Sequence, residues 1–457
     1  MKKLQMFMIV LCCAMSVSAQ NYTKIQGKVK LEGRMKLSEV TLYKTVDGAQ
    51  QAYATTQIAP DGSYGFLMVP ETPGFYTVGG KNIAHIIYIK GGEEINIDIL
   101  DTKGELNGKN SKENEALYQW EDFSHNIRLK SVYFMLSMSN YKDFFPEFST
   151  FVKEVPALKS KIKSGNPEFD KLLQFKIDYD VDYYATIFLQ TPRSIHPKKT
   201  DWPAYYKTII ATDKYTTDEV LQLPLGVRMI SCYASFAYRQ KEYKSYSMDK
   251  YLAELGNDRL KGEYVLLSST GLKSYDAYLE MMDKYGKYFV TPSQKSRAEA
   301  IGVALYDSAP GKDAADFTYP DVNGKQVSLS DFKGKVVLVD VWATWCGPCR
   351  GQIPALKKLE EEMHGEEVVF IGVSVDEAKD KQKWLDFVKK EELKGIQLHA
   401  SGWSKIAKDY KITGIPRFMV FDKAGKIVSV DAPRPSDPKL KSLIEKEVAK
   451  PVVTQKK

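Results

Sequence analysis

Two cysteines near the C-terminal end of the chain stand at C-x-x-C spacing, within the segment Trp345-Cys346-Gly347-Pro348-Cys349. The apolar run 336–339 before them predicts a buried strand, and apolar residues at helical spacing over 353–363 predict a helix after them. We therefore expect Cys346 at a helix N-terminus, where backbone N–H groups and the helix dipole favour a thiolate. Such a pair is suited to thiol–disulfide exchange, with Cys346 as the nucleophile and Cys349 as the resolving thiol.

Other uses of a cysteine pair fit the sequence less well. A structural zinc site needs four ligands, and Cys232 is the only further cysteine outside the N-terminal segment. Covalent haem attachment requires a histidine after the second cysteine, where this chain has Arg350. An inert structural disulfide remains open, although so short a loop stabilises a fold weakly. We expect no metal and no cofactor, and we expect Cys232 to be a buried small apolar residue.

The segment Lys335–Gln352, KVVLVDVWATWCGPCRGQ, resembles the active-site segment of thioredoxins and of the envelope thiol–disulfide oxidoreductases related to ResA and TlpA. The resemblance implies a thioredoxin fold. Thr413-Gly414-Ile415-Pro416 is similar to the cis-proline loop of that superfamily, which implies a cis bond before Pro416 and backbone groups offered to a substrate peptide. Arg417 stands where the family often has threonine, which suggests a preference for an acidic partner. The residues expected to contact substrate are Trp345, Gly347, Pro348, Ile415 and Arg417.

Asp340 interrupts the apolar run of the predicted strand. A carboxylate buried without a partner is costly and usually raises its own pKa. The resemblance implies that Asp340 lies beneath Cys349 and assists its deprotonation. The alternative is a solvent-facing aspartate on an edge strand, because strand patterning alone does not decide which face is wet.

The N-terminal end indicates the compartment. Lys2 and Lys3 precede an apolar run over 6–15, and small residues precede Gln20, as in a secretory signal peptide. The apolar run is too short to span a membrane, and no later segment comes close. We expect residues 1–19 to be cleaved and the mature protein to lie in the periplasm or cell envelope. Cys12 and Cys13 leave a lipoprotein as the minor alternative.

The rest of the chain suggests three domains and a tail. Residues 20–108 alternate as in strands and predict an antiparallel β-sandwich, and their pattern resembles the DUF4369 domain. Residues 109–304 carry long amphipathic segments and predict a helical domain, in which the many tyrosines are expected to pack between helices. Residues 305–450 form the predicted α/β thioredoxin-like domain, and 451–457 a tail. The net charge of +7 is spread among acids and indicates no nucleic-acid binding.

Three functions remain open at this stage. The leading hypothesis is an envelope reductase of protein disulfides, because Gly347 and Pro348 between the cysteines resemble reducing thioredoxins. In an oxidising compartment such a reductase requires a membrane electron donor. The second is a thiol peroxidase of the AhpC/TSA type, suggested by the segment 374–377, although the turn before Cys346 lacks the usual pattern. The third is an envelope binding protein with an accessory redox domain. Substrates among cytochrome c maturation factors or other envelope proteins, and the oligomeric state, stay open.

Overall fold

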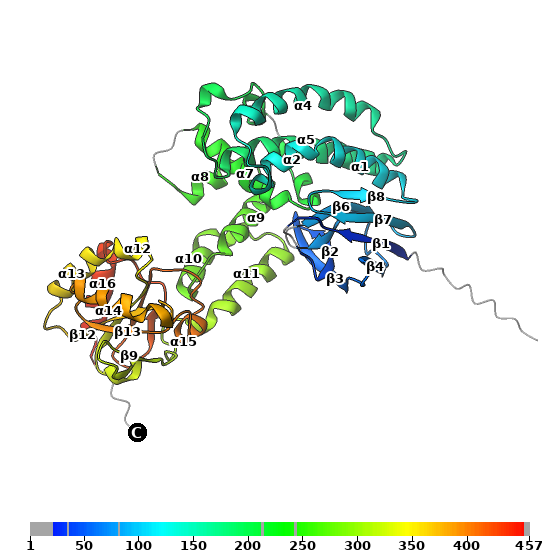
Figure 1. The fold of residues 1–457 in the computed structure, drawn as a ribbon. Helices are drawn as coiled ribbons and strands as arrows, with labels where there is room; N and C mark the ends of the chain where they lie inside the picture. The colour runs from blue at the N-terminus through cyan, green and yellow to red at the C-terminus, as the bar shows by residue number, and fades with distance from the viewer. Residues whose placement is uncertain (1–21, 34–35, 81–82, 212–213, 242–244, 452–457) are drawn as a thin grey trace, which may run out of the picture. The chain divides into compact units, whose positions relative to one another are not determined.

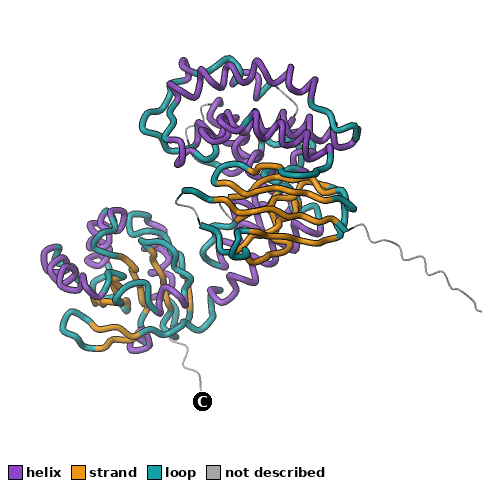
Figure 2. The backbone as a smooth tube through the Cα atoms, turned by 45° about the vertical axis from the view of Figure 1, so that its right-hand side comes forward, coloured by secondary structure: helices purple, strands orange, loops and turns teal. Residues whose placement is uncertain are grey.

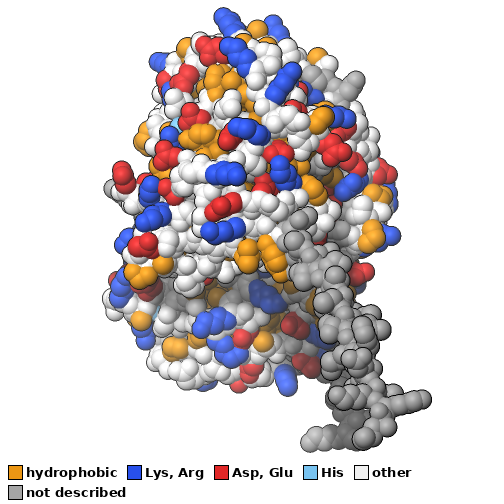
Figure 3. Space-filling view, turned by 90° about the vertical axis from the view of Figure 1, so that its right-hand side faces the viewer, with side chains coloured by type: hydrophobic (Ala, Val, Ile, Leu, Met, Phe, Trp, Pro, Cys, Tyr) orange, Lys and Arg blue, Asp and Glu red, His pale blue; other side chains and the backbone are white. Residues whose placement is uncertain are grey.

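The computed structural model describes residues 22–33, 36–80, 83–211, 214–241 and 245–451. The chain divides into two compact units, Met1–Tyr264 and Val265–Lys457. The predicted signal peptide lies outside the described residues, as does nearly all of the predicted tail. No helix of the described ranges is long and apolar enough to cross a membrane. On the face drawn in Figure 3, lysine and arginine side chains are interspersed with aspartate and glutamate.

The first unit begins with eight strands in two four-stranded sheets. One sheet has the order β4-β1-β7-β8 and the other β3-β2-β5-β6. Apolar side chains of both sheets form one hydrophobic core. The strands are β1 Thr23–Lys30, β2 Glu39–Val46, β3 Ala49–Gln57, β4 Ser63–Met68, β5 Gly74–Gly80, β6 Ile83–Ile89, β7 Glu94–Leu100 and β8 Gly104–Leu106.

The prediction that these sheets are purely antiparallel is wrong at one pair of strands. β1 and β7 run parallel, with Ile25 opposite Ile95 and Val29 opposite Ile99. The alternation of apolar residues in β7 does bury Ile95, Ile97 and Ile99, as expected for a strand with one face in a core. Asn96 and Asp98 on the other face of β7 are buried as well. Alternation therefore shows which face carries the apolar side chains, but it carries no information on the direction of the neighbouring strand.

Helices cover the sheet that contains β6, as the separate helical and strand layers of this unit in Figure 2 show. The side chain of Asn114 on α1 joins the two layers, since it accepts a hydrogen bond from Tyr88 N at 2.9 Å and donates to Tyr88 O at 2.7 Å. The helices of this unit are α1 Lys112–Phe123, α2 His125–Ser131, α3 Phe134–Ser137, α4 Tyr141–Lys161, α5 Pro167–Gln190, α6 Tyr206–Ile209, α7 Gly226–Gln240 and α8 Met248–Leu252, and the boundary of the unit falls within α9 Asp258–Ser269. Short 3₁₀ turns lie at Lys199–Asp201, Lys214–Thr216 and Glu219–Gln222.

The middle of the chain is helical, as predicted, and Cys232 in α7 is buried with a free thiol. The helices do not form a separate compact unit. Those before Tyr264 belong to the unit that holds the two sheets, whereas α10 Tyr275–Tyr285 and α11 Pro292–Leu305 belong to the second unit. Figure 1 shows these two helices beside one another, ahead of the C-terminal domain in sequence.

The second unit contains the predicted thioredoxin-like domain, whose central sheet has the strand order β13-β12-β11-β14-β15. β11 runs parallel to β12 and antiparallel to β14. Apolar clusters cover both faces of this sheet, and one of them includes Cys346 and Cys349. The elements are β9 Thr318–Pro320, β10 Gln326–Ser328, β11 Val336–Trp342, α12 Gly347–Arg350, α13 Ile353–Glu362, β12 Val368–Ser374, α14 Lys381–Lys390, β13 Ile396–His399, α15 Lys405–Asp409, β14 Arg417–Phe421, β15 Ile427–Ser429 and α16 Pro438–Val448, with 3₁₀ turns at Gly286–Tyr288, Tyr306–Ser308, Leu329–Phe332 and Ala378–Asp380.

Candidate active site

The cysteine pair lies directly after the central strand β11. Cys346 caps the N-terminus of α12, and its Sγ accepts a hydrogen bond from the backbone N–H of Cys349 at 3.1 Å. The two residues are joined by a disulfide. The N–H group that points at Cys346 would also stabilise a thiolate there once the disulfide is reduced. The geometry therefore favours Cys346 as the sulfur that is ionised.

The helix that follows the cysteines is interrupted, which the sequence pattern did not predict. α12 ends at Arg350 and α13 begins at Ile353, with Pro354 in its first turn. Proline is favoured in a first turn because its missing N–H would have no intrahelical partner there. A four-residue helix contributes little macrodipole, so the local N–H of Cys349 is the stronger influence on Cys346.

A buried aspartate outside the cysteine motif fixes the loop before Cys346. Asp376 is fully buried and accepts hydrogen bonds from Thr344 N at 2.9 Å and Thr344 Oγ1 at 2.7 Å. Ser374 Oγ donates a further bond to it at 2.6 Å. A carboxylate with this many donors holds the loop in one conformation. In the sequence, the segment 374–377 stood out only for its similarity to AhpC/TSA peroxidases, so this role of Asp376 was not predicted.

Asp340 lies in the centre of the sheet, so the edge-strand alternative is wrong. It pairs with Gly372 of β12, and Gly372 pairs in turn with Gln397 of β13, so the three residues form one row across the strands. A Cβ atom at Gly372 would lie 2.4 Å from Oε1 of Gln397. The missing side chain at position 372 thus leaves the space into which Gln397 extends.

This row borders a small cavity that reaches Cys349. Asp340, Cys349, Glu360 and Gln397 all line it, and its volume of about 20 Å³ is enough for one water molecule. Asp340 Oδ1 and Gln397 Oε1 are buried and have no hydrogen-bond partner among the described residues. Asp340, with its unpaired Oδ1 atom, and Cys349 therefore border the same small cavity.

The surroundings of Asp340 favour its protonated form. Burial, with a smaller contribution from the charge of Glu360, raises the pKa of Asp340 to about 8. Burial also raises the pKa of Glu360 to about 7, against the opposing charges of Lys394 and Lys357. Both carboxyl groups can therefore exchange protons near neutral pH, which is the property required of an acid–base group. Neither Glu360 nor Gln397 stood out in the sequence, because both come from elements remote from the motif.

The peptide bond between Ile415 and Pro416 is cis. Ile415 packs against the apolar cluster that contains both cysteines. Trp345, which precedes Cys346, is 56 % exposed, whereas Cys346 itself is 4 % exposed. Gly347 and Pro348 are exposed as well. The buried Cys346 is thus bordered by exposed residues that are its own neighbours in the sequence.

The structure contradicts the expected contact of the Arg417 side chain with a substrate. The guanidinium is buried, lies 3.5 Å from a carboxylate oxygen of Asp431, and donates a hydrogen bond to Val430 O at 3.1 Å. Position 417 is the first residue of β14 and points into the protein. An internal ion pair therefore engages the charge that was expected to attract an acidic partner.

A thioredoxin-like sheet with a C-x-x-C disulfide at a strand-to-helix junction defines the class of thiol–disulfide oxidoreductases. The Redoxin family model matches residues 309–444. The thiol-disulfide oxidoreductase ResA of Bacillus thuringiensis is 33% identical over 138 residues, which are 28% of this chain and 78% of that protein. The thioredoxin-like protein YneN of Bacillus subtilis is 33% identical over 122 residues, covering 26% of this chain and 69% of that protein.

Among solved structures, the thioredoxin domain of a thiol-disulfide oxidoreductase from Bacteroides vulgatus is 31% identical, covering 31% of this chain and 98% of that one at a TM-score of 0.27. A thiol-disulfide oxidoreductase from Bacteroides fragilis is 28% identical, with 30% and 98% coverage and a TM-score of 0.27. Through its C-terminal domain, this chain belongs to the ResA/TlpA-like thiol–disulfide oxidoreductases of the thioredoxin superfamily.

Proposed function

We propose that this enzyme is an envelope reductase of protein disulfides that works through Cys346 and Cys349. The observation that carries the proposal is the position of Cys346, whose sulfur receives the Cys349 N–H and whose neighbours in the sequence are exposed. That geometry suits a thiolate that attacks an approaching disulfide. The Gly347–Pro348 pair between the cysteines, as in reducing thioredoxins, supports the reductive direction.

The reaction would proceed in two exchanges. The Cys346 thiolate attacks one sulfur of the substrate disulfide, forms a mixed disulfide and releases the other substrate sulfur as a thiolate. Cys349 then loses its proton and attacks Cys346, which releases the second substrate sulfur. The substrate gains two electrons, and the enzyme is left with the Cys346–Cys349 disulfide.

Asp340 is the proposed proton acceptor for Cys349. Both residues line the same small cavity, and Asp340 Oδ1 has no hydrogen-bond partner among the described residues that would favour the ionised form. Its ionised fraction grows as pH rises toward its pKa of about 8. The resolving step is therefore expected to accelerate over that range, because a thiol is a poor nucleophile until it loses its proton.

The location and partners complete the proposal. The N-terminal segment 1–19 has the pattern of a secretory signal, which would deliver the enzyme to the periplasm. An oxidising compartment would leave the cysteines as a disulfide, so a membrane protein that donates electrons must reduce them. The substrates would be envelope proteins with oxidised cysteines, including those of cytochrome c maturation.

Trapping of mixed disulfides tests the function. In Cys349→Ala the first exchange proceeds and the second cannot, so envelope proteins should remain linked to Cys346 and be released by a reductant. The double variant Cys346→Ala, Cys349→Ala is the matched control and should trap none. Equal recovery of disulfide-linked proteins with both variants would refute the assignment of Cys346 as the nucleophile.

The reduction potential of the cysteine pair tests the direction of electron flow. A value near roughly −270 mV is expected for a reductant, whereas roughly −120 mV would mark a donor of disulfides and reverse the proposal. The measurement is thiol alkylation of Cys346 and Cys349 across a series of dithiol buffers.

A further inference from the structure

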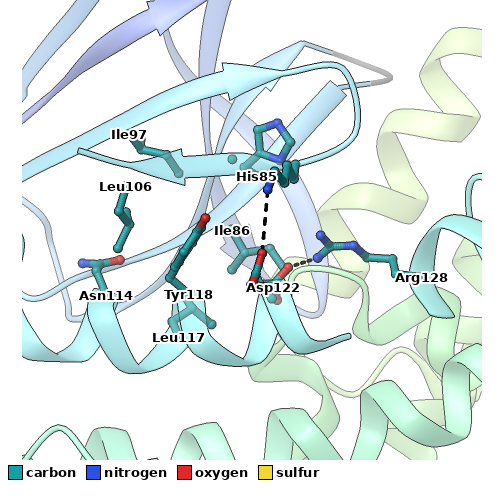
Figure 4. Close-up of a pocket in the computed structure, with 12 residues that line it drawn as sticks. His85, Ile86, Ile97, Leu106, Asn114, Leu117, Tyr118, Asp122 and Arg128 are labelled. Carbon is teal, nitrogen blue, oxygen red and sulfur yellow. Dashed lines mark hydrogen bonds and ion pairs between the residues drawn. The ribbon is translucent and has the colours of Figure 1, made fainter. Parts of the chain in front are cut away.

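The first unit contains a cavity far larger than the one beside Cys349. Its volume is about 330 Å³, within the range of small-molecule binding sites. Ala84 and Ile86 of β6 form its wall on the side of the sheet, and residues of α2, α5 and α7 form the opposite wall. Ile86, Glu121 and Arg128 also line a smaller adjoining cavity, in which Figure 4 shows Arg128 reaching toward the acidic end of α1.

Buried charges line the larger cavity. Lys176 is 2 % exposed and lies 2.9 Å from Glu121 Oε1 and 2.5 Å from Asp180 Oδ2. Arg128 forms an ion pair with Glu121. With Arg228 at the same cavity, three cationic side chains face two carboxylates. Lys176 and Arg128 are compensated by Glu121 and Asp180, as buried charges require, so the positive charge left over at the cavity is that of Arg228.

Arg228 is the cation without a partner. It is exposed on α7, and the described residues give it no hydrogen bond or ion pair. A guanidinium presents two parallel N–H groups whose spacing matches the two oxygens of a carboxylate. Arg228 is therefore positioned at the cavity to receive a carboxylate that enters from solvent.

Two buried hydrogen-bond donors without partners among the described residues also indicate a ligand that accepts hydrogen bonds. Tyr183 lines the cavity and is 1 % exposed, and its hydroxyl has no hydrogen-bond partner among the described residues. The Nε atom of Arg128 is likewise buried without a partner there. Both atoms carry a hydrogen to donate, and buried donors are normally satisfied. Tyr133 and Tyr184 beside them supply flat apolar surface.

We propose that this cavity binds a small organic monoanion, a carboxylate attached to a flat apolar body. The carboxylate would pair with Arg228 and accept hydrogen bonds from the buried donors, while the body would lie against the tyrosines and Ile86. The ligand would supply the negative charge that Arg228 lacks among the described residues. This binding function is separate from thiol–disulfide exchange and does not depend on the cysteines.

Isothermal titration calorimetry of the full chain with benzoate tests the proposal. Benzoate should bind saturably with one site per chain, and benzamide, which has the same shape without the charge, should bind at least tenfold more weakly. Inorganic phosphate should also bind more weakly than benzoate because it has no apolar body. Absence of saturable benzoate binding at millimolar concentrations, or equal binding of benzamide or phosphate, would overturn the proposal and leave a hydrated structural cavity.

Variants place the binding at this cavity. Arg228→Gln should weaken benzoate binding at least tenfold, whereas Arg239→Gln, an exposed arginine on the same helix that does not line the cavity, should leave it unchanged. Tyr183→Phe removes a hydroxyl that makes no hydrogen bond in the structure, so the protein should fold normally and bind benzoate several-fold more weakly. Unchanged affinity in both Arg228→Gln and Tyr183→Phe would exclude this cavity as the site.

Discussion

Two aspartates on neighbouring parts of the same sheet have opposite surroundings. Asp376, just after β12, accepts three hydrogen bonds from Thr344 and Ser374. Asp340, in β11, has an oxygen that is buried without any partner among the described residues. Hydrogen bonds from several donors stabilise the ionised form of a carboxylate and hold it in place. A buried carboxylate without such bonds has a raised pKa and can change its protonation state near neutral pH. The comparison separates a carboxylate that positions the active-site loop from one that can move a proton.

Removal of the satisfied carboxylate should give the largest effect. Asp376→Ala leaves three buried donors of Thr344 and Ser374 unpaired, and we expect a loss of about 4 kcal/mol in the free energy of unfolding. Urea denaturation of the oxidised protein measures it. Glu377→Ala is the control, because Glu377 forms only an exposed ion pair with Lys379 and should change stability by less than about 1 kcal/mol. Similar losses in both variants would mean that the hydrogen bonds of Asp376 contribute no more to the free energy of unfolding than an exposed ion pair does.

The unpaired carboxylate should reveal itself in the pH dependence of stability. Between pH 3.8 and about 8, Asp340 is ionised in the unfolded chain and protonated in the folded one, so its contribution lowers stability as pH rises. Asp340→Asn removes this dependence. The variant should gain about 3 kcal/mol relative to the parent between pH 4 and pH 8, a figure reduced for the partial exposure of the side chain. Urea denaturation at several pH values checks the slope, and parallel curves for the two proteins would contradict the raised pKa.

The same substitution should slow the resolving step. Without the Asp340 carboxylate beside Cys349, the release of substrate from the mixed disulfide should fall about tenfold at pH 8, equal to ~1.4 kcal/mol of barrier, and lose its rise between pH 7 and pH 8. Stopped-flow measurement of disulfide reduction follows this step. The rate of the first attack by Cys346 should remain unchanged, and an equal slowing of both steps would indicate a general structural defect.

The comparison also shows what the sequence could predict. Asp340 was identifiable because a carboxylate interrupted an apolar strand next to a recognisable cysteine motif, and the thioredoxin-like domain around it is confirmed. The role of Asp376 could not be identified from the sequence, because its partner Thr344 is 32 residues away. Only the parallel register of β11 with β12 brings the two residues together. Sequence patterns report which residues are buried, but hydrogen-bond partners depend on strand register.

Other differences have the same origin. β13 was missed because its four residues are too short to show a period, and it carries Gln397 into the cavity beside Asp340. The break between α12 and α13 was missed because the apolar residues at helical spacing begin only at Ile353, after the break, and so carry no information on residues 347–352. The large cavity of the first unit could not be predicted from the sequence, since Arg128 and Arg228 are a hundred residues apart in the chain and meet at the cavity because α5 packs against both α2 and α7.

Substitution of Glu360 should give the smallest of the expected effects, because it changes only one contribution to the raised pKa of Asp340. Its charge raises the pKa of Asp340, so Glu360→Gln should lower that pKa and move the pH midpoint of the resolving rate to lower pH. The rate at pH 7 should then rise, by less than about threefold, because burial remains the larger cause of the shift.

Glu362→Gln is the control, since Glu362 is exposed and pairs with Lys441 at 2.9 Å. Stopped-flow rates across pH distinguish the outcomes. A midpoint that moves equally in both variants would assign the effect to the overall charge of α13, whereas a shift confined to Glu360→Gln would show that the two carboxyl groups titrate together in the cavity.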